Sequence, residues 1–306
     1  MKKQAIFLMG PTASGKTSLA IQLVKYLPVD IISVDSAMVF RGLDIGTGKP
    51  TASELACAPH QLIDICDPAQ AYSSAQFCID ASLAMQNSWQ QNRIPLLVGG
   101  TMLYFKALQD GLAILPSADY ELRKILTVQA QELGWPVMHA KLVELDPISA
   151  QRLSVNDSQR IQRALEINIL TGKSLNENYQ QQKKMVLDYH LSSFAIIPER
   201  AGLHLAIEKR FINMLDLGLI KEVEGLYKHG NLDLDMPSMR SVGYRQVWSY
   251  LNNAIDYNTM REQAIAATRQ LAKRQYTWLR SWPAITNLDA ANDLSLEIIL
   301  KSIALS

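Results

Sequence analysis

A glycine-rich loop near the start of the chain constrains its fold more than any other feature. Gly10 to Thr17 (GPTASGKT) matches the phosphate-binding pattern G-x-x-x-x-G-K-[ST] at every required position. The loop follows a short apolar run, Ala5 to Met9, which is typical of a buried parallel strand. It precedes Ser18 to Tyr26, where apolar residues recur at helical spacing. Strand, loop and helix in this order predict a phosphate site at a helix N-terminus.

The residues of the loop have distinct expected roles. The backbone N–H groups of Thr12 to Thr17 are expected to converge on an anion. Lys16 would add a positive charge, and the Thr17 hydroxyl would serve as a ligand for Mg²⁺. An ordinary strand-to-helix turn that happens to match the pattern is the alternative. The predicted binding residues of the loop are Gly10, Pro11, Thr12, Ala13, Ser14, Gly15, Lys16 and Thr17.

Composition excludes several classes of protein. The 306 residues are 48% hydrophobic, enough for one large or two ordinary globular domains, and the net charge of +1 means that any basic surface must be local. Cys57, Cys66 and Cys78 form no C-x-x-C pair, which argues against disulfides and structural zinc and favours a reducing cytoplasm. No apolar run approaches 18 residues, so we expect neither a membrane span nor a removable signal.

A second apolar strand, Asp30 to Val34, ends in Asp35 and Ser36. A carboxylate at the carboxyl end of a parallel strand lies on the edge where such sheets bind ligands. Gly42 to Pro50 is expected to form a loop over the site, and Leu62 to Ile65 a third strand. Ser74 to Gln91 is expected to form a helix with a serine cap.

A further buried strand, Ile94 to Val98, is followed by Gly99, Gly100 and Thr101. Nucleotide-hydrolysing proteins with this loop usually have an aspartate there, which holds Mg²⁺. The absence of an acid weakens the hypothesis of an ATP-hydrolysing motor or switch, although Asp35 could serve the metal instead.

The pattern changes between about residues 117 and 189. Long polar stretches with apolar residues at helical spacing replace the short strands, which predicts a small all-helical insertion domain at 117–189 within an α/β core formed by 1–116 and 190–306. Within it, Arg160 and Arg163 could grip phosphates from one helix face. Solvated arginines are the commoner alternative.

The last part of the chain combines basic and aromatic residues. Ser192 to Ile197 resembles a returning strand, and seven basic residues against two acidic ones lie between 240 and 280. Arg269, Lys273, Tyr276 and Arg280 align on one helix face. A cationic ridge with stacking side chains favours single-stranded or looped RNA. A solvated helix with core aromatics is the equally weighted alternative.

Five segments, taken in order over nearly the whole chain, resemble the bacterial tRNA dimethylallyltransferases of the IPP transferase family. They are GPTASGKT, SVDSAMVFRGLDIGTGKP, LVGGTMLY, RSVGYR and AKRQYTWLR. The family often has a tyrosine at the position of Phe40 and an alanine at that of Gly48, and both differences are mild. The resemblance implies an α/β fold with a P-loop NTPase-like core, a parallel sheet flanked by helices, and the helical insertion.

The resemblance also implies a reaction. The family transfers a dimethylallyl group from dimethylallyl diphosphate to N6 of the adenosine immediately 3′ of the anticodon, in tRNAs reading codons that start with U. Asp35 matches the general base, Thr101 the residue at the bridging oxygen, and Lys16 and Arg210 the groups on the diphosphate, with Mg²⁺ as cofactor. The expected partners are tRNA and dimethylallyl diphosphate, and the expected state is a cytoplasmic monomer.

The family pattern further assigns tRNA contacts. In this sequence they fall on Asp35, Ser36, Ala37, Met38, Thr101, Arg123, Gln159, Arg160, Ile161, Gln162, Arg163, Arg240, Ser241, Val242, Gly243, Tyr244, Arg245, Lys273, Arg274, Gln275, Tyr276, Thr277, Trp278, Leu279 and Arg280. Three other functions share parts of the pattern: a small-molecule or nucleotide kinase, an isopentenyltransferase acting on free adenine nucleotides, and a non-catalytic RNA-binding switch.

Overall fold

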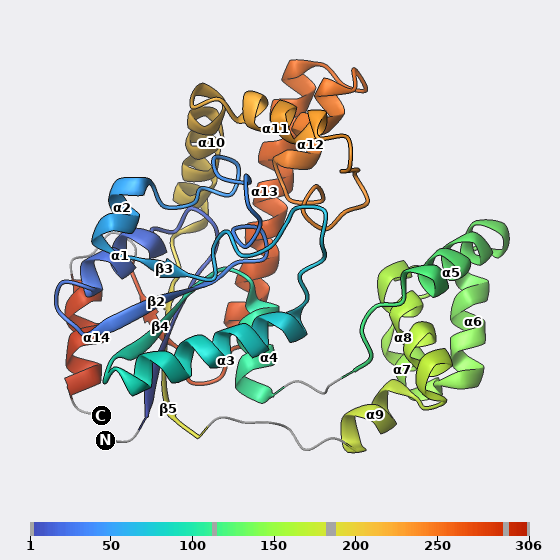
Figure 1. Cartoon of the computed structure of the whole chain (residues 1–306), viewed down its shortest axis with the longest axis horizontal. Coiled ribbons are helices and arrows are strands. Elements are labelled where there is room, and N and C mark those ends of the chain that lie inside the picture. Colours follow the sequence, from blue (N-terminus) through green and yellow to red (C-terminus); the bar gives the residue numbers. More distant parts are fainter. Residues whose placement is uncertain (1–2, 112–114, 182–187, 290–293, 305–306) are drawn as a thin grey trace. The chain divides into compact units, whose positions relative to one another are not determined.

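The computed structural model describes residues 3–111, 115–181, 188–289 and 294–304 (Figure 1). The chain forms two compact units, the larger from 1–109 with 187–306 and the smaller from 110–186. The larger unit is an α/β core, and the smaller unit is built from helices in its described part. Sequence analysis placed the insertion at 117–189.

A parallel sheet forms the centre of the larger unit. Its six strands lie in the order β3-β2-β4-β1-β5-β6, and all neighbouring pairs are parallel. This confirms the expected fold class. The strands are β1 Gln4–Met9, β2 Val29–Val34, β3 His60–Gln61, β4 Ile94–Gly99, β5 His190–Ile196 and β6 Thr286–Leu288.

The prediction of a strand at Leu62 to Ile65 is wrong. The strand beside β2 is His60–Gln61, and it ends where Leu62 and Asp64 take positive φ angles of 61° and 56°. A left-handed backbone does not continue a strand, so the apolar side chains of this segment do not extend the sheet.

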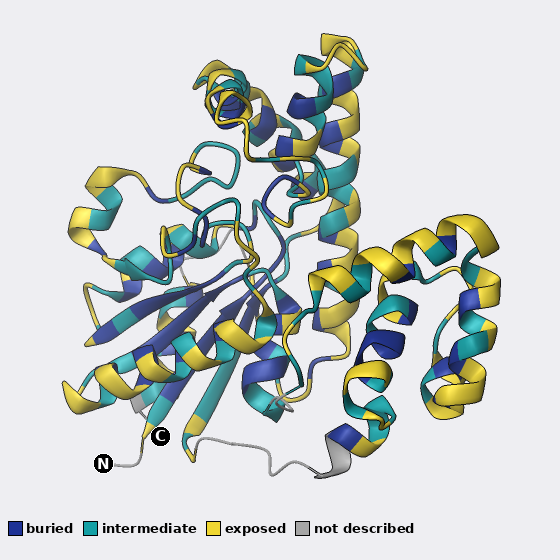
Figure 2. Ribbon diagram, turned by 45° about the vertical axis from the view of Figure 1, so that its right-hand side comes forward, coloured by how far each residue is buried: buried dark blue, intermediate teal, exposed yellow. Residues whose placement is uncertain are grey.

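Helices flank the sheet and form the C-terminal part of the larger unit. They are α1 Lys16–Leu23, α2 Ala52–Cys57, α3 Ser74–Gln90, α4 Met102–Asp110, α10 Arg200–Asp216, α11 Leu219–Lys228, α12 Tyr244–Leu251, α13 Tyr257–Arg280 and α14 Leu294–Ala304. Ser73 caps α3 by accepting from the N–H of Gln76. The central strands β1, β2 and β4 are buried over nearly their whole length, as the dark blue strands of Figure 2 show.

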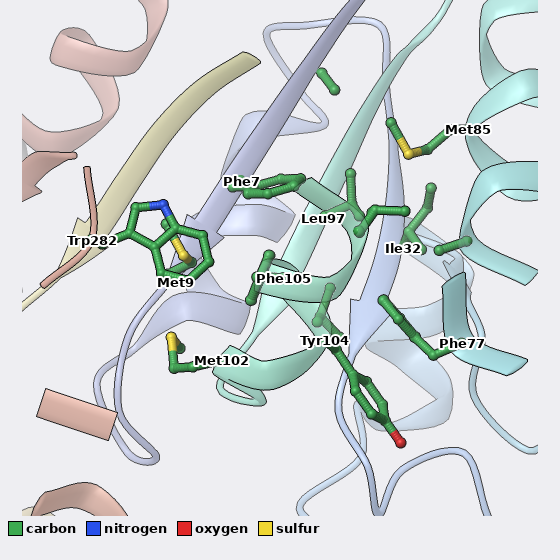
Figure 3. Close-up of a cluster of buried hydrophobic side chains, with 14 of the residues drawn as sticks. Phe7, Met9, Ile32, Phe77, Met85, Leu97, Met102, Tyr104, Phe105 and Trp282 are labelled. Carbon is green, nitrogen blue, oxygen red and sulfur yellow. The ribbon is translucent and has the colours of Figure 1, made fainter. Parts of the chain in front are cut away.

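Alternation along the strands divides the core into two layers. Phe7 and Met9 of β1 point to one face, where they pack with Phe77 of α3, Phe105 of α4 and Trp282 (Figure 3). Residues such as Ile6 and Leu8 point to the other face and pack against α1 and α14. Burial on both faces explains why the strands are continuous apolar runs without polar alternation.

A separate core holds the C-terminal helices together. Phe211, Val223, Tyr244 and Ala264 come from α10, α11, α12 and α13 respectively, and pack with the segment 39–43 that follows β2. This packing fixes the chain between β2 and the loop 42–50.

The smaller unit has its own hydrophobic core. Its helices are α5 Tyr120–Leu133, α6 Trp135–Leu145, α7 Pro147–Arg152, α8 Ser158–Thr171 and α9 Leu175–Gln181. Leu126, Met138, Leu142 and Ile161 pack together inside it. Aspartates cap α5, α7 and α8 by accepting backbone N–H groups, which stabilises short helices. In the described ranges, no helix has both the length and the apolar character that crossing a membrane requires.

We predict that Gly99→Ala destabilises the sheet. A Cβ at Gly99 would overlap the carbonyl oxygen of Val34 in the neighbouring strand β2, and neither backbone can move without breaking the ladder. We expect a loss of roughly 1–3 kcal/mol, seen as a lower urea midpoint. Gly225→Ala in α11 is the control, because its Cβ would meet nothing within 4 Å and should stabilise by up to about 1 kcal/mol. An unchanged midpoint for Gly99→Ala would contradict the packing argument.

Candidate active site

A cavity of about 610 Å³ opens at the carboxyl edge of β1, β2 and β4 in the larger unit. Its walls come from the loop after β1, the segment after β2, the loop 42–50, the turn after β4, and helices α10 and α13. Parallel strands collect ligand sites at this edge because all of their carboxyl ends meet there.

The phosphate loop takes the tight form that its glycines predict. Gly15 precedes α1 with a φ of 88°, and a Cβ at Gly10 would lie 2.8 Å from both the Ile196 oxygen and Ser14 Oγ. Lys16 Nζ donates to the Pro11 carbonyl at 2.6 Å and to Ser14 Oγ at 3.3 Å, which closes the loop around the ammonium group. Lys16 and Thr17 both line the cavity.

One loop amide differs from the expectation. The Thr12 N–H donates to Oε1 of Gln275 at 2.9 Å and so does not face an anion in this structure. The amides available to a phosphate group therefore begin at Ala13, which has a positive φ of 62°. Successive N–H groups in such a turn form an anion-binding nest.

Asp35 is held in one orientation at the end of β2. Its Oδ1 accepts the N–H groups of Ala37 at 2.8 Å and Met38 at 3.2 Å. Within the described residues no hydrogen bond reaches Oδ2, and Asp35 lines the cavity. The next N–H, that of Ser36, donates to Thr101 Oγ1 at 3.1 Å and so connects the ends of β2 and β4. The arrangement leaves one carboxylate oxygen able to accept a proton from a ligand.

Arg210 brings a second cation to the phosphate loop from α10. Its Nη2 donates to the Thr47 carbonyl at 3.0 Å and its Nη1 to Thr12 Oγ1 at 3.5 Å. Burial, followed by the charge of Arg210, lowers the pKa of Lys16 to about 7, although Asp35 opposes this shift. Burial likewise lowers the pKa of Arg210. Two partly buried cations near a single carboxylate favour a multiply charged anion.

The close approach of Arg210 also accounts for the absence of a side chain at position 48. A Cβ there would overlap Arg210 Nη2, and Gly48 has a φ of 65°. An alanine at this position, as the family often has, would require Arg210 to shift.

Glu222 holds the loop 42–50, a role that was not predicted from the sequence. Its carboxylate accepts the N–H of Ile45 at 2.6 Å, those of Asp44 and Gly46 at 3.2 Å, and the Tyr244 hydroxyl. Burial and then Glu222 raise the pKa of Tyr244. Glu222 belongs to no motif and lies far from the loop in sequence, so only the fold reveals its role.

The donor set of the cavity fits Mg²⁺. The Thr17 hydroxyl and the Asp35 carboxylate offer hard oxygen ligands, and the part of the chain that the structure describes contains no cluster of three His, Cys, Asp or Glu side chains for a metal. Mg²⁺ commonly takes one or two protein oxygens and completes its shell with phosphate oxygens and water. An aspartate at Gly99 has no room, because its Cβ would overlap the Val34 backbone, and a side chain at Gly100 would displace the Gln275 amide.

Many of the predicted tRNA-binding residues of the larger unit surround this cavity. Those that line it are Asp35, Ser36, Ala37, Met38, Thr101, Arg240, Ser241, Val242, Gly243, Tyr244, Arg274, Gln275 and Trp278. Arg245, Lys273, Thr277 and Arg280 are exposed, whereas Leu279 is buried.

The helix face predicted from Arg269, Lys273, Tyr276 and Arg280 is not uniformly free. Arg269 pairs with Glu208 of α10 at 2.8 Å, and the Tyr276 hydroxyl donates to the Pro198 carbonyl. Tyr244 and Trp248 lie in the core. The interpretation as core aromatics therefore holds for these two, while Trp278 remains 38% exposed.

The predicted contacts of the smaller unit gather around a buried acid. Arg123 donates through both Nε and Nη2 to Glu166 at 2.9 Å, and Arg163 through Nη1 at 2.6 Å. Burial opposes ionisation of Glu166, but the hydrogen bonds from both arginines outweigh it and lower its pKa. Gln162 donates to the carbonyl of Arg123. Glu166 thus fixes the orientation of both guanidinium groups.

The other members of the α8 segment differ in exposure. Gln159 and Arg160 are exposed, and Arg160 pairs with Asp157 at 3.0 Å. Ile161 is completely buried in the core of the smaller unit.

The fold and the cavity define a P-loop α/β protein that binds a phosphorylated ligand. The chain belongs to the IPP transferase family: the family model described as IPP transferase matches residues 38–282, and that of isopentenyl transferase matches residues 3–67. This confirms the resemblance inferred from the five sequence segments.

Individual relatives agree with this assignment. A tRNA dimethylallyltransferase of Thiobacillus denitrificans is 55% identical over 290 residues, 94% of this chain and 92% of the relative. The tRNA isopentenylpyrophosphate transferase structure from Bacillus halodurans matches with a TM-score of 0.72 and 34% identity, over 99% of this chain and 96% of that one. A eukaryotic dimethylallyltransferase captured acting on tRNA gives a TM-score of 0.82 at 25% identity, over 99% of this chain and 78% of that one.

We predict that diphosphate binding is linked to protonation of Lys16. Because the pKa of Lys16 is about 7 in the free protein, its amine is mostly neutral at pH 8. A bound diphosphate stabilises the ammonium form, so binding should take up close to one proton, and affinity should fall as the pH rises above 7. Calorimetry with inorganic diphosphate in buffers of different ionisation enthalpy measures this uptake. Lys16→Met is the control that isolates it, and equal uptake by both proteins would refute the assignment.

Proposed function

We propose that the chain transfers a dimethylallyl group from dimethylallyl diphosphate to N6 of the adenosine 3′-adjacent to the anticodon, in tRNAs reading codons that start with U. The products are N6-(dimethylallyl)adenosine and diphosphate. Close relationship to tRNA dimethylallyltransferases supports the activity. The observation that supports the residue roles is one cavity in which Lys16 and Arg210 adjoin an oriented Asp35.

The phosphate loop binds the diphosphate of the donor. Lys16, Arg210 and the amides from Ala13 to Thr17 neutralise the negative charge that grows on the leaving group as the allylic C–O bond breaks. Thr101, which also lines the cavity, contacts the bridging oxygen. Mg²⁺ would be held by the Thr17 hydroxyl together with diphosphate oxygens, and it supplies further charge neutralisation.

Asp35 serves the acceptor amine. The N6 lone pair of adenine is delocalised into the ring, so the amine must lose a proton as the new C–N bond forms. Asp35 Oδ2 takes this proton, while hydrogen bonds from Ala37 and Met38 hold Oδ1. The diphosphate leaves with the electron pair of the C–O bond.

The RNA must present its base outside the stack. A stacked adenosine cannot reach a diphosphate inside the cavity, so it flips into the cavity, whose lining includes Trp278 and Met38. Arg240, Arg274 and the exposed residues of α13 bind phosphates around the entrance. Arg123, Arg160 and Arg163 of the smaller unit bind the anticodon stem-loop.

One assay tests the function against its alternatives. Purified protein is incubated with Mg²⁺, labelled dimethylallyl diphosphate and either tRNA or AMP, and the label in each acceptor is counted. We expect label in tRNA alone. Label in AMP would indicate a free-nucleotide isopentenyltransferase, and no label in either would favour a kinase or an RNA-binding switch.

We predict that Asp35→Asn removes general-base catalysis. Asparagine keeps the size of the side chain and accepts the same N–H groups, but it does not take a proton at neutral pH. The single-turnover rate should fall by ~10²–10⁴-fold, while the affinities for donor and tRNA change little. Asp216→Asn at the exposed end of α10 is the matched control. A large loss of donor affinity would instead make Asp35 chiefly a metal ligand, and a rate near that of the wild type would exclude it from the chemistry.

We predict that Arg274 binds an RNA phosphate. It lines the cavity and projects from the exposed side of α13. Affinity for tRNA should fall steeply as the salt concentration rises. Arg274→Ala should weaken this affinity and reduce the slope of log affinity against log salt concentration by the equivalent of roughly one released counterion at most. Filter binding across a salt series measures both, with Arg200→Ala at the exposed start of α10 as control. Unchanged slopes for Arg274→Ala would show that this guanidinium is merely solvated.

A further inference from the structure

The side-chain amide of Gln275 lies between the two loops that carry the reaction. Gln275 projects from α13 and is only 7% exposed. Its Oε1 accepts the N–H of Thr12 in the phosphate loop at 2.9 Å, and its Nε2 donates to the carbonyl of Gly100 at 2.8 Å. Gly100 immediately precedes Thr101. One amide therefore touches both the diphosphate-binding loop and the turn after β4.

These two bonds continue the sheet beyond its last paired residues. β1 and β4 are neighbours, and their register ends at Met9 opposite Gly99. Past this point the two loops no longer pair directly. The Gln275 amide uses its carbonyl oxygen and one of its two N–H donors here, so it bridges the loops much as an inserted peptide group would.

The site requires a glutamine and a glycine together. A glutamate would accept from Thr12 but would oppose the Gly100 carbonyl, and a leucine would leave both backbone groups without a partner. A Cβ at Gly100 would overlap Nε2 of Gln275, so the amide reaches its acceptor only because position 100 is glycine. Buried polar groups that lose their partners are costly, which gives the bridge a defined geometry.

We infer that Gln275 is a positioning residue that sets the distance between the bound diphosphate and the acceptor side of the site. On one side it holds the phosphate loop. On the other it holds Gly100 and Thr101, and Thr101 in turn accepts the N–H of Ser36 beside Asp35. This inference rests on the proposed function. It gives Gln275 a role different from the RNA contact that the family resemblance implies.

Helix α13 connects RNA docking to the diphosphate site through Gln275. Lys273, Arg274 and Trp278 lie on the same helix as Gln275 and are exposed to varying degrees, whereas Gln275 points inward. An RNA that shifts α13 therefore shifts the bridge as well. A displacement of about 1 Å between two reacting atoms can lower the rate ~10²-fold. We therefore expect substitution of Gln275 to lower the rate of transfer more than it lowers the affinity for donor or for tRNA.

The first test compares Gln275→Leu with Gln270→Leu. Gln270 lies on the same helix but is exposed, so the substitution is chemically matched. For Gln275→Leu we expect a single-turnover rate, at saturating donor and tRNA, lower by ~10–100-fold. The affinities for tRNA and for inorganic diphosphate should stay within a few fold. Gln270→Leu should retain the wild-type rate.

Two results would overturn the inference. A Gln275→Leu rate within threefold of the wild type would show that the bridge does not position the reaction. A loss confined to tRNA affinity would make Gln275 a direct RNA contact. If Gln275→Leu melts well below the wild type, Gln275→Glu replaces it, because glutamate keeps the acceptor for Thr12 but loses the donor to Gly100 and opposes the Gly100 carbonyl. It should also lower the single-turnover rate at saturating donor and tRNA, and a wild-type rate would likewise count against the inference.

A double-mutant cycle tests the bridge itself. Gly100→Ala should displace Gln275 and so resemble Gln275→Ala, and the double variant should lose little more rate than the worse single variant. If the fold-losses in rate of the two single variants multiply in the double variant, positions 100 and 275 act independently. Failure of the proposed function is distinguishable from these outcomes, since it would appear as no transfer to tRNA by the wild type and by Gln270→Leu.

Discussion

The parallel pairing of β2, β4 and β1 is the interaction on which the rest of the structure depends. Asp35 follows β2, Thr101 follows β4 and the phosphate loop follows β1, so three segments far apart in sequence arrive at one edge of the sheet. Val34 of β2 pairs with Gly99 of β4, where there is no room for a Cβ, so the first two of these segments leave the sheet close together. The chemistry of the cavity follows from which strands are neighbours.

Electrostatics then determines what the cavity accepts. Burial first, and then the charge of Arg210, lowers the pKa of Lys16, so the free protein disfavours the charged form of this amine. A bound diphosphate would favour it. The Glu222 carboxylate is engaged elsewhere, because it accepts backbone N–H groups of the loop 42–50 and the Tyr244 hydroxyl.

Sequence revealed those parts of the molecule that local patterns encode. The phosphate loop, Asp35 at a strand end and the α/β class all depend on short segments whose spacing predicts their structure. Glu222 was not recognised, and Gln275 was expected only as a tRNA contact, because each acts on backbone groups of a distant segment, which no spacing records. Helical periodicity aligned Arg269 and Tyr276 with Lys273 on one face, but it does not say that α10 packs against part of that face. The prediction of a strand at Leu62 to Ile65 was wrong for a local reason: the backbone there is left-handed at Leu62 and Asp64, and the apolar residues of the segment do not indicate this.

The division of the α/β unit between two stretches of chain has a consequence for its folding during synthesis. Gln4 of β1 pairs with His190 of β5, and Thr12 pairs with Gln275, so the N-terminal strand finds its later partners only after the whole helical unit has been made. At ~5–20 residues per second this delay is roughly 10–40 s. The smaller unit, whose helices contact near neighbours in sequence, can fold during this interval. The diphosphate site is therefore assembled last, when α13 leaves the ribosome, and donor binding cannot assist the earlier steps of folding.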